Sequence, residues 1–484
     1  MLQHNDAKKL KKRTKIVATL GPACMEEDVM RRMIMAGVNV FRINFSHHKP
    51  DTSVAIVTQI RNISRELQLP VAILGDLRGP RIRVGNVRDG KIRLATGHKI
   101  IMTPEPVLGD EDRISFSYPH LAGDVAPGTT ILIDNGVIIL EVKECRENDT
   151  IHCLVTRGGE LSSRRGMNLP GTKISLPALT QKDIEDVDFA ITNQLDFLAL
   201  SFVQSAEDVV QLKSLLMSKN ATIPIIAKIE NHHALQDIEA IAGESYGVMV
   251  ARGDLALEMS IQEIPIAQKR IIDVCRQAAV PVITATQMLE SMIDHPQPTR
   301  AEATDIANAV LDGTDALMLS GETAIGKYPL ETVETMVCIA HRMEEAWLQG
   351  ETPGPPAMEP REEIDSTIAY ASTVIARTLK AATIITHTTT GSTSRRVAKH
   401  RPHIPILALT SCQQTQRWLA LSWGVDSALI EDIDDTRQLV EAACNEALVF
   451  RFAQAGDTLV ISAGIPLRMS GKTNFIRVEQ IPHH

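Results

Sequence analysis

The chain of 484 residues is long enough for about two to four domains, and its 44% hydrophobic content is sufficient for sizeable, mostly aliphatic cores. A formal net charge of −9 excludes the broad basic face that non-specific nucleic-acid binding needs. The seven cysteines form no C-x-x-C pair, and no apolar run approaches the ~18 residues of a membrane span. We therefore expect a reduced cytoplasmic protein without structural zinc or a membrane segment.

The N-terminal part of the chain alternates apolar runs with helical segments. A basic tail at 1–13 precedes three continuously apolar runs, at 14–20, 38–44 and 71–76. Runs without polar alternation are typical of strands buried on both faces, as in parallel sheets. The segments between these runs have apolar residues at helical spacing, which predicts a β/α succession.

The pattern changes between residues 79 and 173, where the apolar runs are short and Gly, Pro and Asp recur about every ten residues. Residues 91–102, 130–142 and 150–156 are predicted as antiparallel strands. Asp134-Asn135-Gly136 is a strong hairpin signal. This stretch is expected to form a small all-β domain inserted into the β/α succession.

The β/α succession resumes with a predicted helix at 180–193 and five further apolar runs. The predicted strands lie at 196–202, 223–229, 246–251, 280–285 and 315–320. Eight strands, each followed by a helical segment, predict a (β/α)₈ TIM barrel with the β domain inserted after its third strand. A doubly wound sheet is the alternative, but the Gly-rich dinucleotide turn that it should carry after an early strand is absent.

The expected domain organisation follows from these patterns. A catalytic barrel is formed by 14–78 and 174–349, and 79–173 form the inserted β lid. The Pro-rich, charged segment 350–363 is typical of a linker. Beyond it, 364–484 contain alternating strands and helices of a separate C-terminal α/β domain.

Polar side chains follow two neighbouring strands within the stretch 225–259. Lys228 and Glu230 end one apolar run, and Asp254 follows the next one. Because chemistry in parallel barrels is located at the C-terminal ends of the strands, these groups should lie side by side. Two carboxylates suit Mg²⁺, and an adjacent lysine suits a transferring phosphate. The alternative is a pair of strand-end caps with a surface ion pair.

The other predicted strands add cationic, anionic and hydroxyl groups at the same C-terminal end of the barrel. They are Arg42, Asn44, Ser46, Asp76, Arg252, Thr286, Gln287, Ser320 and Glu322. The set lacks the two histidines and carboxylate expected of zinc or iron hydrolases. No Walker motif or kinase Gly-rich loop is present, so a nucleotide would depend on lid arginines. The candidates are Arg78, Arg81, Arg83, Arg164 and Arg165, with a solvated basic face as the alternative.

Long motifs spread over nearly the whole chain resemble those of the pyruvate kinase family. They are TKIVATLGP, AGVNVFRINFSHH, GDLRGPRIRVG, RRGMNLPG, AKIEN, VMVARGDLALEM, ITATQMLESM and PTRAEATDIANAVLDGTDALMLSGETAIGKYP. The resemblance implies transfer of the phosphoryl group of phosphoenolpyruvate to ADP, giving pyruvate and ATP in glycolysis. It also implies a homotetramer.

The resemblance also implies a role for each matched residue. Lys228, Thr286 and Arg42 correspond to catalytic positions, and Glu230 and Asp254 to the Mg²⁺ ligands, with Mn²⁺ as an alternative ion. The substrate would contact Arg42, Gly253, Asp254, Thr286 and Ser320. The nucleotide would contact Asn44, Phe45, Ser46, His47, Arg83 and Arg165.

One departure from the family pattern concerns a monovalent cation. Members that need K⁺ carry an acidic residue after the Gly-Pro of the third-strand motif, whereas this chain has Arg81. Its fixed charge would replace the ion, so we expect K⁺ independence. The monovalent site itself would consist of Asn44, Ser46, Asp76 and the Leu77 carbonyl.

The last domain carries a hydroxyl-rich loop between a predicted strand and a helix, where backbone N–H groups can bind an anion. Simple N-capping is the alternative. The loop resembles the family's effector loop, which implies an allosteric sugar phosphate or a nucleotide such as AMP. The effector residues would be Thr388, Thr389, Thr390, Gly391, Ser392, Thr393 and Arg468.

Two other functions compete with a pyruvate kinase. One is another Mg²⁺-dependent barrel enzyme that handles pyruvate enolate, such as a carbon–carbon lyase; ADP dependence distinguishes it. The other is a non-catalytic metabolite sensor with an inactive barrel, which the intact Lys228, Glu230, Asp254 and Thr286 argue against.

Overall fold

The structure is a computed structural model that describes residues 12–46, 50–146, 149–467 and 472–483. Eight parallel strands form a closed barrel, which confirms the predicted architecture. In chain order they are β1 (Lys15–Thr19), β2 (Val40–Asn44), β3 (Ala72–Asp76), β12 (Phe197–Leu200), β13 (Ile225–Ile229), β14 (Gly247–Ala251), β15 (Val282–Ala285) and β16 (Ala316–Leu319). Each is shorter than predicted at one or both ends.

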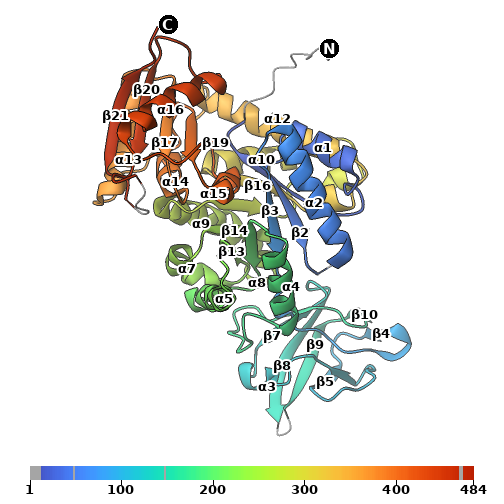
Figure 1. The fold of residues 1–484 in the computed structure, drawn as a ribbon. Helices are drawn as coiled ribbons and strands as arrows, with labels where there is room; N and C mark the ends of the chain where they lie inside the picture. The colour runs from blue at the N-terminus through green and yellow to red at the C-terminus, as the bar shows by residue number, and fades with distance from the viewer. Residues whose placement is uncertain (1–11, 47–49, 147–148, 468–471, 484) are drawn as a thin grey trace.

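Helices surround the barrel and bury its outer face (Figure 1). They are α1 (Glu27–Ala36), α2 (Pro50–Leu67), α4 (Gln181–Thr192), α5 (Ala206–Ser218), α6 (His232–Gln236), α7 (Ile238–Glu244), α8 (Arg252–Glu258), α9 (Ile264–Ala278), α10 (Arg300–Asp312), α11 (Gly321–Ala324) and α12 (Pro329–Leu348). The crossover from β13 to β14 is two short helices rather than the single helix predicted. Asp237 separates them, and its carboxylate accepts a hydrogen bond from the Ala206 backbone at 2.9 Å. No described helix is both long and apolar enough to cross a membrane.

The lid is a β domain that leaves the barrel after β3. Its sheets have the strand orders β11-β7-β8-β9-β5-β6 and β10-β4. The strands are β4 (Lys91–Leu94), β5 (Lys99–Thr103), β6 (Arg113–Ser115), β7 (Thr130–Ile133), β8 (Ile138–Arg146), β9 (Thr150–Arg157), β10 (Gly159–Ser162) and β11 (Met167–Asn168). The single strand predicted at 91–102 is wrong: a turn through Gly97, at φ 85°, sends β4 and β5 into different sheets. The hairpin turn at 134–136 is confirmed, with positive φ at all three residues.

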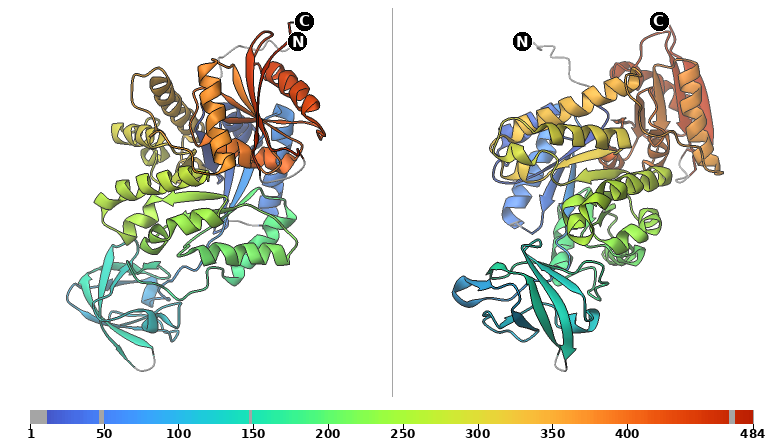
Figure 2. Two further views of the ribbon diagram at one scale, coloured as in Figure 1. Left: turned by 90° about the vertical axis from the view of Figure 1, so that its left-hand side faces the viewer. Right: turned by 180° about the vertical axis from the view of Figure 1, so that it is seen from behind.

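The C-terminal domain is a five-stranded sheet with helices on both faces (Figure 2). Its strand order is β19-β18-β17-β20-β21, and only the edge strand β21 is antiparallel to its neighbour. The strands are β17 (Thr383–His387), β18 (Ile406–Thr410), β19 (Val425–Leu429), β20 (Thr458–Ala463) and β21 (Phe475–Gln480). Helix α16 (Thr436–Val449) packs on one face, and α13 (Ile364–Thr378) and α14 (Ser392–Ala398) pack on the other.

The lid and the C-terminal domain lie at opposite ends of the barrel (Figure 1). The apolar interior of the barrel continues into the C-terminal domain, where Ala420 and Leu421 join the same cluster as Phe197 and Met249. These two residues belong to a 3₁₀ turn, η4 (Leu419–Leu421), that follows α15 (Gln413–Trp418). The C-terminal domain therefore closes the N-terminal end of the barrel.

Three arginines of the C-terminal domain contact residues that directly precede barrel strands. Arg417 pairs with Asp196 at 2.6 Å, before β12, and Arg401 pairs with Asp315 at 3.0 Å, before β16. Arg395 donates to the Tyr246 carbonyl at 3.4 Å, before β14, and its guanidinium lies 4.2 Å from the centre of the Tyr246 ring. Charged contacts thus join the domain to three of the eight strand starts.

The predicted solvated tail is wrong at its last two residues. Lys12 donates to Asn39 at 2.8 Å, and the Arg13 guanidinium donates to the Pro402 and His403 carbonyls of the C-terminal domain. The Arg13 backbone also donates to Glu344 at 2.7 Å. Residues 1–11 lie outside the described part of the chain.

Candidate active site

Lys228 lies at the centre of a buried polar cluster at the C-terminal end of the barrel. Its ammonium group is 2.9 Å from Glu230 and 3.4 Å from Asp76, and it donates to the Ser201 hydroxyl at 2.7 Å. Burial alone would lower the pKa of Lys228, but the two carboxylates outweigh burial and raise the pKa above its ordinary value. The lysine is therefore held as a fixed positive charge.

The two predicted metal ligands have the properties of a cation site. Glu230 is only 2% exposed, and burial, opposed by Lys228 and reinforced by the nearby Asp254, raises its pKa to about 7. One Glu230 oxygen accepts from the Phe202 backbone at 2.7 Å. Among the described residues, none makes a hydrogen bond or ion pair with the Asp254 carboxylate. Two adjacent carboxylates, one without a protein partner, fit a divalent cation with oxygen ligands.

No larger metal cluster is present in the described residues: no group of three or more His, Cys, Asp or Glu side chains is arranged to hold an ion. The adjacent His232 and His233 do not form one. The His232 ring is paired with Gln236 at 2.9 Å on the same helix. The donor set at Glu230 and Asp254 would therefore leave several coordination positions to substrate oxygens or water, as Mg²⁺ prefers.

The turn after β15 holds Thr286 in a strained conformation. Thr286 and Gln287 have φ values of 69° and 55°, in the left-handed region that β-branched residues rarely adopt. The Thr286 hydroxyl accepts from the Gly253 backbone at 2.8 Å and donates to the Ala285 carbonyl at 2.6 Å. Thr286 is therefore fixed directly against the Gly253-Asp254 turn.

Arg252, one of the predicted strand-end residues, supports this turn. Its guanidinium donates to the Thr286 carbonyl at 2.7 Å and pairs with Asp305 at 2.7 Å. The helix α8 begins at Arg252, so the same residue links the ends of β14 and β15. This dense bonding accounts for how the strained backbone at Thr286 is maintained.

Arg42 extends the cluster toward the first strands of the barrel. It forms a 2.6 Å ion pair with Asp76 and donates to the Thr19 hydroxyl at 3.0 Å. Its side chain keeps 11% of its surface exposed, whereas Asp76 is 2% exposed. Lys228 and Arg42 together lower the pKa of Asp76 despite its burial. The two cations and the carboxylate between them form one rigid unit.

Ser201 is a site residue that the sequence interpretation missed. Its hydroxyl accepts from Lys228 and donates to the Leu77 carbonyl at 2.7 Å, while Asp76 lies 3.4 Å away. The rule used for the other strand ends would have found it, because Ser201 directly follows β12. The Leu77 carbonyl, a predicted monovalent-cation ligand, is already bound by this hydroxyl.

Ser320 lies at the end of β16 and is linked to the neighbouring strand end by Glu322. The fully buried Glu322 accepts from the Ser320 backbone at 2.6 Å and from the Leu289 backbone at 3.2 Å. Within the described residues, no hydrogen bond or ion pair joins Ser320 to the Lys228 cluster. Glu322 therefore ties the loop that carries Thr286 to the loop that carries Ser320.

The predicted nucleotide residues after β2 have different environments. Asn44 accepts from the Ser46 backbone at 3.1 Å, which makes a tight turn with Ser46 exposed. The Phe45 ring is 3% exposed and packs edge-on against Phe189 with 5.9 Å between ring centres, so its side chain is not open to a nucleotide. Only its backbone is left for a ligand. His47 lies outside the described residues.

The predicted lid arginines lie together at the side of the lid that joins the barrel. Arg83 pairs with Gly166 as an isolated bridge and donates to the Arg164 carbonyl at 3.0 Å. Burial, with help from the neighbouring Arg78 and Arg81, lowers the pKa of Arg83. Arg165 forms a 3.3 Å ion pair with Asp134 of the hairpin turn. This concentration of positive charge fits a polyphosphate.

Arg81 lies in a cavity of about 80 Å³ between the lid and the barrel. Its guanidinium covers Gly166, where a side chain would collide with it. Glu258 and His233 line the same cavity. Within the described part of the chain, no ion pair joins Arg81 to a carboxylate. The charge of Arg81 is therefore not neutralised locally.

The predicted effector loop joins β17 to α14. Thr388 and Thr393 are buried: Thr388 accepts from the Gly391 backbone at 2.9 Å, and Thr393 contacts Thr473 at 2.9 Å. Thr389 and Thr390 are exposed, and the Thr390 hydroxyl donates to Ser392 at 3.3 Å. Arg468 lies outside the described residues. The loop thus has an inner pair of threonines that shape it and an outer group open to a ligand.

Comparisons with known proteins agree over the whole chain. The family description "Pyruvate kinase, barrel domain" matches residues 11–333, and "Pyruvate kinase, alpha/beta domain" matches residues 366–479. Pyruvate kinase 2 of Synechocystis sp. is 44% identical over 98% of this chain and 80% of its own length. A pyruvate kinase of Geobacillus stearothermophilus is 42% identical over 98% and 81%, respectively. A crystal structure of a pyruvate kinase from Cryptosporidium parvum has a TM-score of 0.90, with 35% identity over 98% of both chains.

Proposed function

The chain belongs to the pyruvate kinase family and is a pyruvate kinase that uses phosphoenolpyruvate and ADP; we propose that it does so with Mg²⁺ held by Glu230 and Asp254. The observation that supports this most directly is the largely buried Lys228, 12% exposed in its side chain, at 2.9 Å from Glu230 and beside Asp254, which has no ion-pair partner among the described residues. This is a cation and two oxygen ligands at the expected end of a TIM barrel. We also propose a role in glycolysis and a homotetrameric assembly, both from family membership alone.

In the proposed reaction, the bond between phosphorus and the enolate oxygen of phosphoenolpyruvate breaks, and a bond to the terminal phosphate oxygen of ADP forms. The enolate carbon then takes up a proton, which gives pyruvate. Lys228 and Arg42 bind the transferring phosphoryl group, whose charge spreads over three oxygens in the transition state. A divalent ion, when bound, would supply further positive charge to the same oxygens.

The other groups orient the substrate and the proton. The Gly253 turn and Thr286 would bind the substrate carboxylate, since the strained Thr286 backbone fixes its hydroxyl at 2.8 Å from the Gly253 N–H. The Thr286 hydroxyl donates to the Ala285 carbonyl at 2.6 Å, and we assign this hydroxyl to the proton relay. Arg83 and Arg165 of the lid, with the turn at Asn44 and Ser46, would bind the ADP phosphates.

The test is pyruvate formation from phosphoenolpyruvate by the full chain, with ADP and Mg²⁺ each omitted in turn. We expect turnover only when both are present, with Mn²⁺ able to replace Mg²⁺. Turnover without ADP would favour a carbon–carbon lyase or a phosphatase. A folded protein that binds a sugar phosphate but is inactive under every condition would favour a metabolite sensor.

We predict that turnover does not require K⁺. The Asp76 carboxylate already contacts Arg42 and Lys228, the Leu77 carbonyl binds Ser201, and Arg81 adds an unneutralised charge at the base of the lid. The rate in tetramethylammonium buffer should stay within about twofold of the rate in K⁺, a difference below about 0.5 kcal/mol.

The matched variant for the K⁺ experiment is Arg81→Glu, which restores the acidic residue of K⁺-dependent relatives. We expect its rate to fall about tenfold or more without K⁺ and to recover when K⁺ is added, which is about 1.4 kcal/mol. A large drop of the unmodified chain in K⁺-free buffer would contradict the prediction. If the rate of the Arg81→Glu enzyme does not depend on K⁺, Arg81 is not the cause of the K⁺ independence.

We predict that a phosphorylated effector activates the enzyme through the loop 388–393. Thr390 is exposed and Ser392 half-buried, and both carry hydroxyls that suit a phosphate. Ser392→Asp places a negative charge there and should abolish activation by AMP and sugar phosphates, while kcat/KM without effector stays within about twofold. The readout is phosphoenolpyruvate saturation with each compound, and unchanged activation in the variant would place the effector elsewhere.

A further inference from the structure

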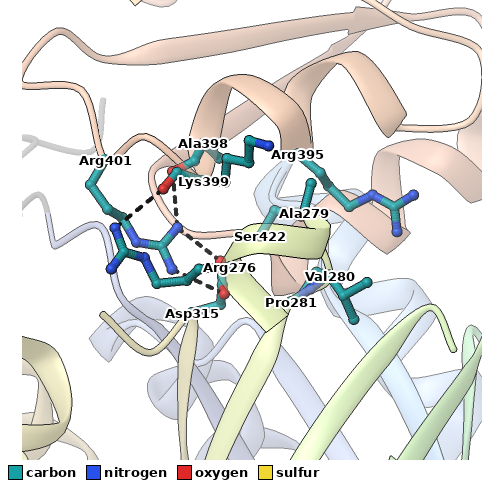
Figure 3. Close-up of a pocket in the computed structure, with 10 residues that line it drawn as sticks. All are labelled: Arg276, Ala279, Val280, Pro281, Asp315, Arg395, Ala398, Lys399, Arg401 and Ser422. Atoms are coloured by element: carbon teal, nitrogen blue, oxygen red, sulfur yellow. Dashed lines mark hydrogen bonds and ion pairs between the residues drawn. The ribbon is translucent and has the colours of Figure 1, made fainter. Parts of the chain in front are cut away.

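A cluster of buried cations lines a small cavity between the barrel and the C-terminal domain, at the end of the barrel opposite the active site (Figure 3). The cavity has a volume of about 10 Å³. Arg276, at the end of α9, approaches it from the barrel, and the other cations come from α14 and the turn that follows it. The charged and polar residues that line it are Arg276, Asp315, Arg395, Lys399, Arg401 and Ser422.

The charge in this cluster is not balanced by its lining. Four cations and a single carboxylate, Asp315, line the cavity. Arg401 pairs with Asp315 at 3.0 Å and Arg276 lies beside it, whereas the side chains of Arg395 and Lys399 point away from that carboxylate (Figure 3). Arg276 donates only to backbone carbonyls, those of Pro356 at 3.0 Å and Lys399 at 3.4 Å. Backbone carbonyls accept hydrogen bonds but carry no negative charge. The cluster therefore keeps a net positive charge in a buried position.

The other cations are also without carboxylate partners in this cluster. Lys399 is 5% exposed and donates to the Gln277 carbonyl at 3.4 Å and the Ser366 hydroxyl at 3.2 Å. Arg395 donates to the Tyr246 carbonyl. The nearby carboxylate of Asp365 is already paired with Arg396 at 2.6 Å. Asp273 near Arg276, and Glu363 and Asp365 near Lys399, act to raise the pKa of these cations, but within the described residues none of the three carboxylates forms an ion pair with Arg276 or Lys399.

Several polar atoms of the lining lack a hydrogen-bond partner. In the described part of the chain, the Nε atoms of Arg276, Arg395 and Arg401 and the Oγ atom of Ser422 are buried and unsatisfied. The residues Arg276, Arg401 and Ser422 are 3%, 4% and 1% exposed. Unsatisfied donors of this kind are costly, and a group of them around one cavity indicates a missing acceptor.

The electrostatics agree with this geometry. Burial, followed by the charge of Arg401, lowers the pKa of Arg276 to about 10. Burial, together with Lys399 and Arg276, also lowers the pKa of the adjacent His400 to about 4, so this ring is neutral and adds no charge. Both shifts are those expected where positive charge is in excess and a negative charge would be stabilised.

We propose that this cavity binds one small inorganic anion, of the size of chloride, which joins the barrel to the C-terminal domain. The volume corresponds to about one water-sized sphere, so a sugar phosphate does not fit, and a halide fits after a small shift of the lining side chains. Arg276 comes from the barrel, whereas Arg395, Arg401 and Ser422 come from the C-terminal domain. The bound ion therefore offsets repulsion across the interface between the two domains, and the site is separate from the effector loop.

The direct test is to locate bromide by anomalous scattering in crystals of the full chain grown with about 0.2 M sodium bromide, a concentration that fills weak millimolar sites. We expect a peak in the cavity within contact of Arg276 and Ser422. Crystals in which bromide occupies other positions but not this cavity would overturn the proposal. Density for sulfate or phosphate in the cavity, without bromide under matched conditions, would overturn the size limit and with it the proposal.

A solution test uses thermal unfolding at constant ionic strength, with gluconate replaced by chloride. Replacing about 0.2 M gluconate should raise the Tm of the unmodified chain by about 2 °C. Arg276→Gln should remove most of this increase, and Ser422→Ala should reduce it. Arg437→Gln removes the same charge from the exposed face of α16 and should leave the increase intact.

The proposal is overturned if chloride raises the Tm of Arg276→Gln as much as it raises the Tm of the unmodified chain. It is also overturned if the unmodified chain has the same Tm in chloride and in gluconate. If Arg276→Gln does not fold, Ser422→Ala and the bromide position in the unmodified chain decide the question without it. Basal kcat should be unchanged in all variants, since none of these residues lies at the active-site end of the barrel.

Discussion

Replacing Lys228 by methionine should lower kcat by about 10³–10⁵-fold while phosphoenolpyruvate binding changes little, because a cation on a transferring phosphoryl group is worth about 4–7 kcal/mol. The lysine side chain is only 12% exposed and is fixed by Glu230, Asp76 and Ser201. Arg42 remains in the variant and still binds the phosphate of the ground state. The loss should therefore appear in kcat and not in the dissociation constant.

The measurement combines steady-state turnover with calorimetric binding of phosphoenolpyruvate in the presence of Mg²⁺. Lys213→Met is the matched control, since Lys213 lies on α5, pairs with Glu244 and is 42% exposed in its side chain. It should keep nearly full activity. Near-normal turnover of Lys228→Met would remove the lysine from the mechanism, and a loss of binding equal to the loss of kcat/KM would make its role one of substrate binding alone.

Replacing Arg401 by methionine should destabilise the chain by about 3–5 kcal/mol, the usual cost of breaking a buried ion pair from one side. Asp315 is 5% exposed and would lose its ion pair, although Arg276 stays nearby and the Trp423 and Val282 backbones still donate to it at 3.1 Å. The Gly313 carbonyl would also lose its donor. Because Asp315 precedes β16, the effect should extend into the barrel.

Urea unfolding followed by fluorescence and by circular dichroism would measure this change, with the two probes reporting whether the domains unfold together. Arg437→Met removes an arginine whose pair with Glu441 is exposed, and it should cost less than about 1 kcal/mol. A double variant that also replaces Asp315 by asparagine should recover part of the stability. A small effect of Arg401→Met would mean that backbone donors alone stabilise Asp315.

The barrel and most of its catalytic groups could be predicted because both follow from local patterns. Continuous apolar runs identify strands buried on two faces, and the C-terminal ends of such strands meet by geometry, which placed Lys228, Glu230 and Asp254 together. The same rule extends to Ser201, which was missed only because the predicted strand ended beyond it. The residue-by-residue roles came from the family resemblance and not from the patterns.

Features that depend on side-chain packing between distant segments could not be predicted. Phe45 follows a strand in a motif rich in polar residues, yet its ring turns into the core beside Gly75, where only a residue without a side chain leaves room. Arg13 belongs to a basic tail by composition but is bound to two carbonyls of the last domain. In each case the partner lies far along the chain, and nothing in the local pattern indicates it.

The contacts through which the C-terminal domain closes the N-terminal end of the barrel also imply an order of assembly during synthesis. All eight strands have been made when Leu319 is complete, but Ala420 and Leu421, which close their apolar interior, come later, as do Arg401 and Arg417. Until then Asp196 and Asp315 lack these cations, and the apolar opening is uncovered. A nascent chain is therefore exposed to wrong association during this interval. Removing the C-terminal domain should yield an aggregation-prone barrel rather than a smaller, unregulated enzyme.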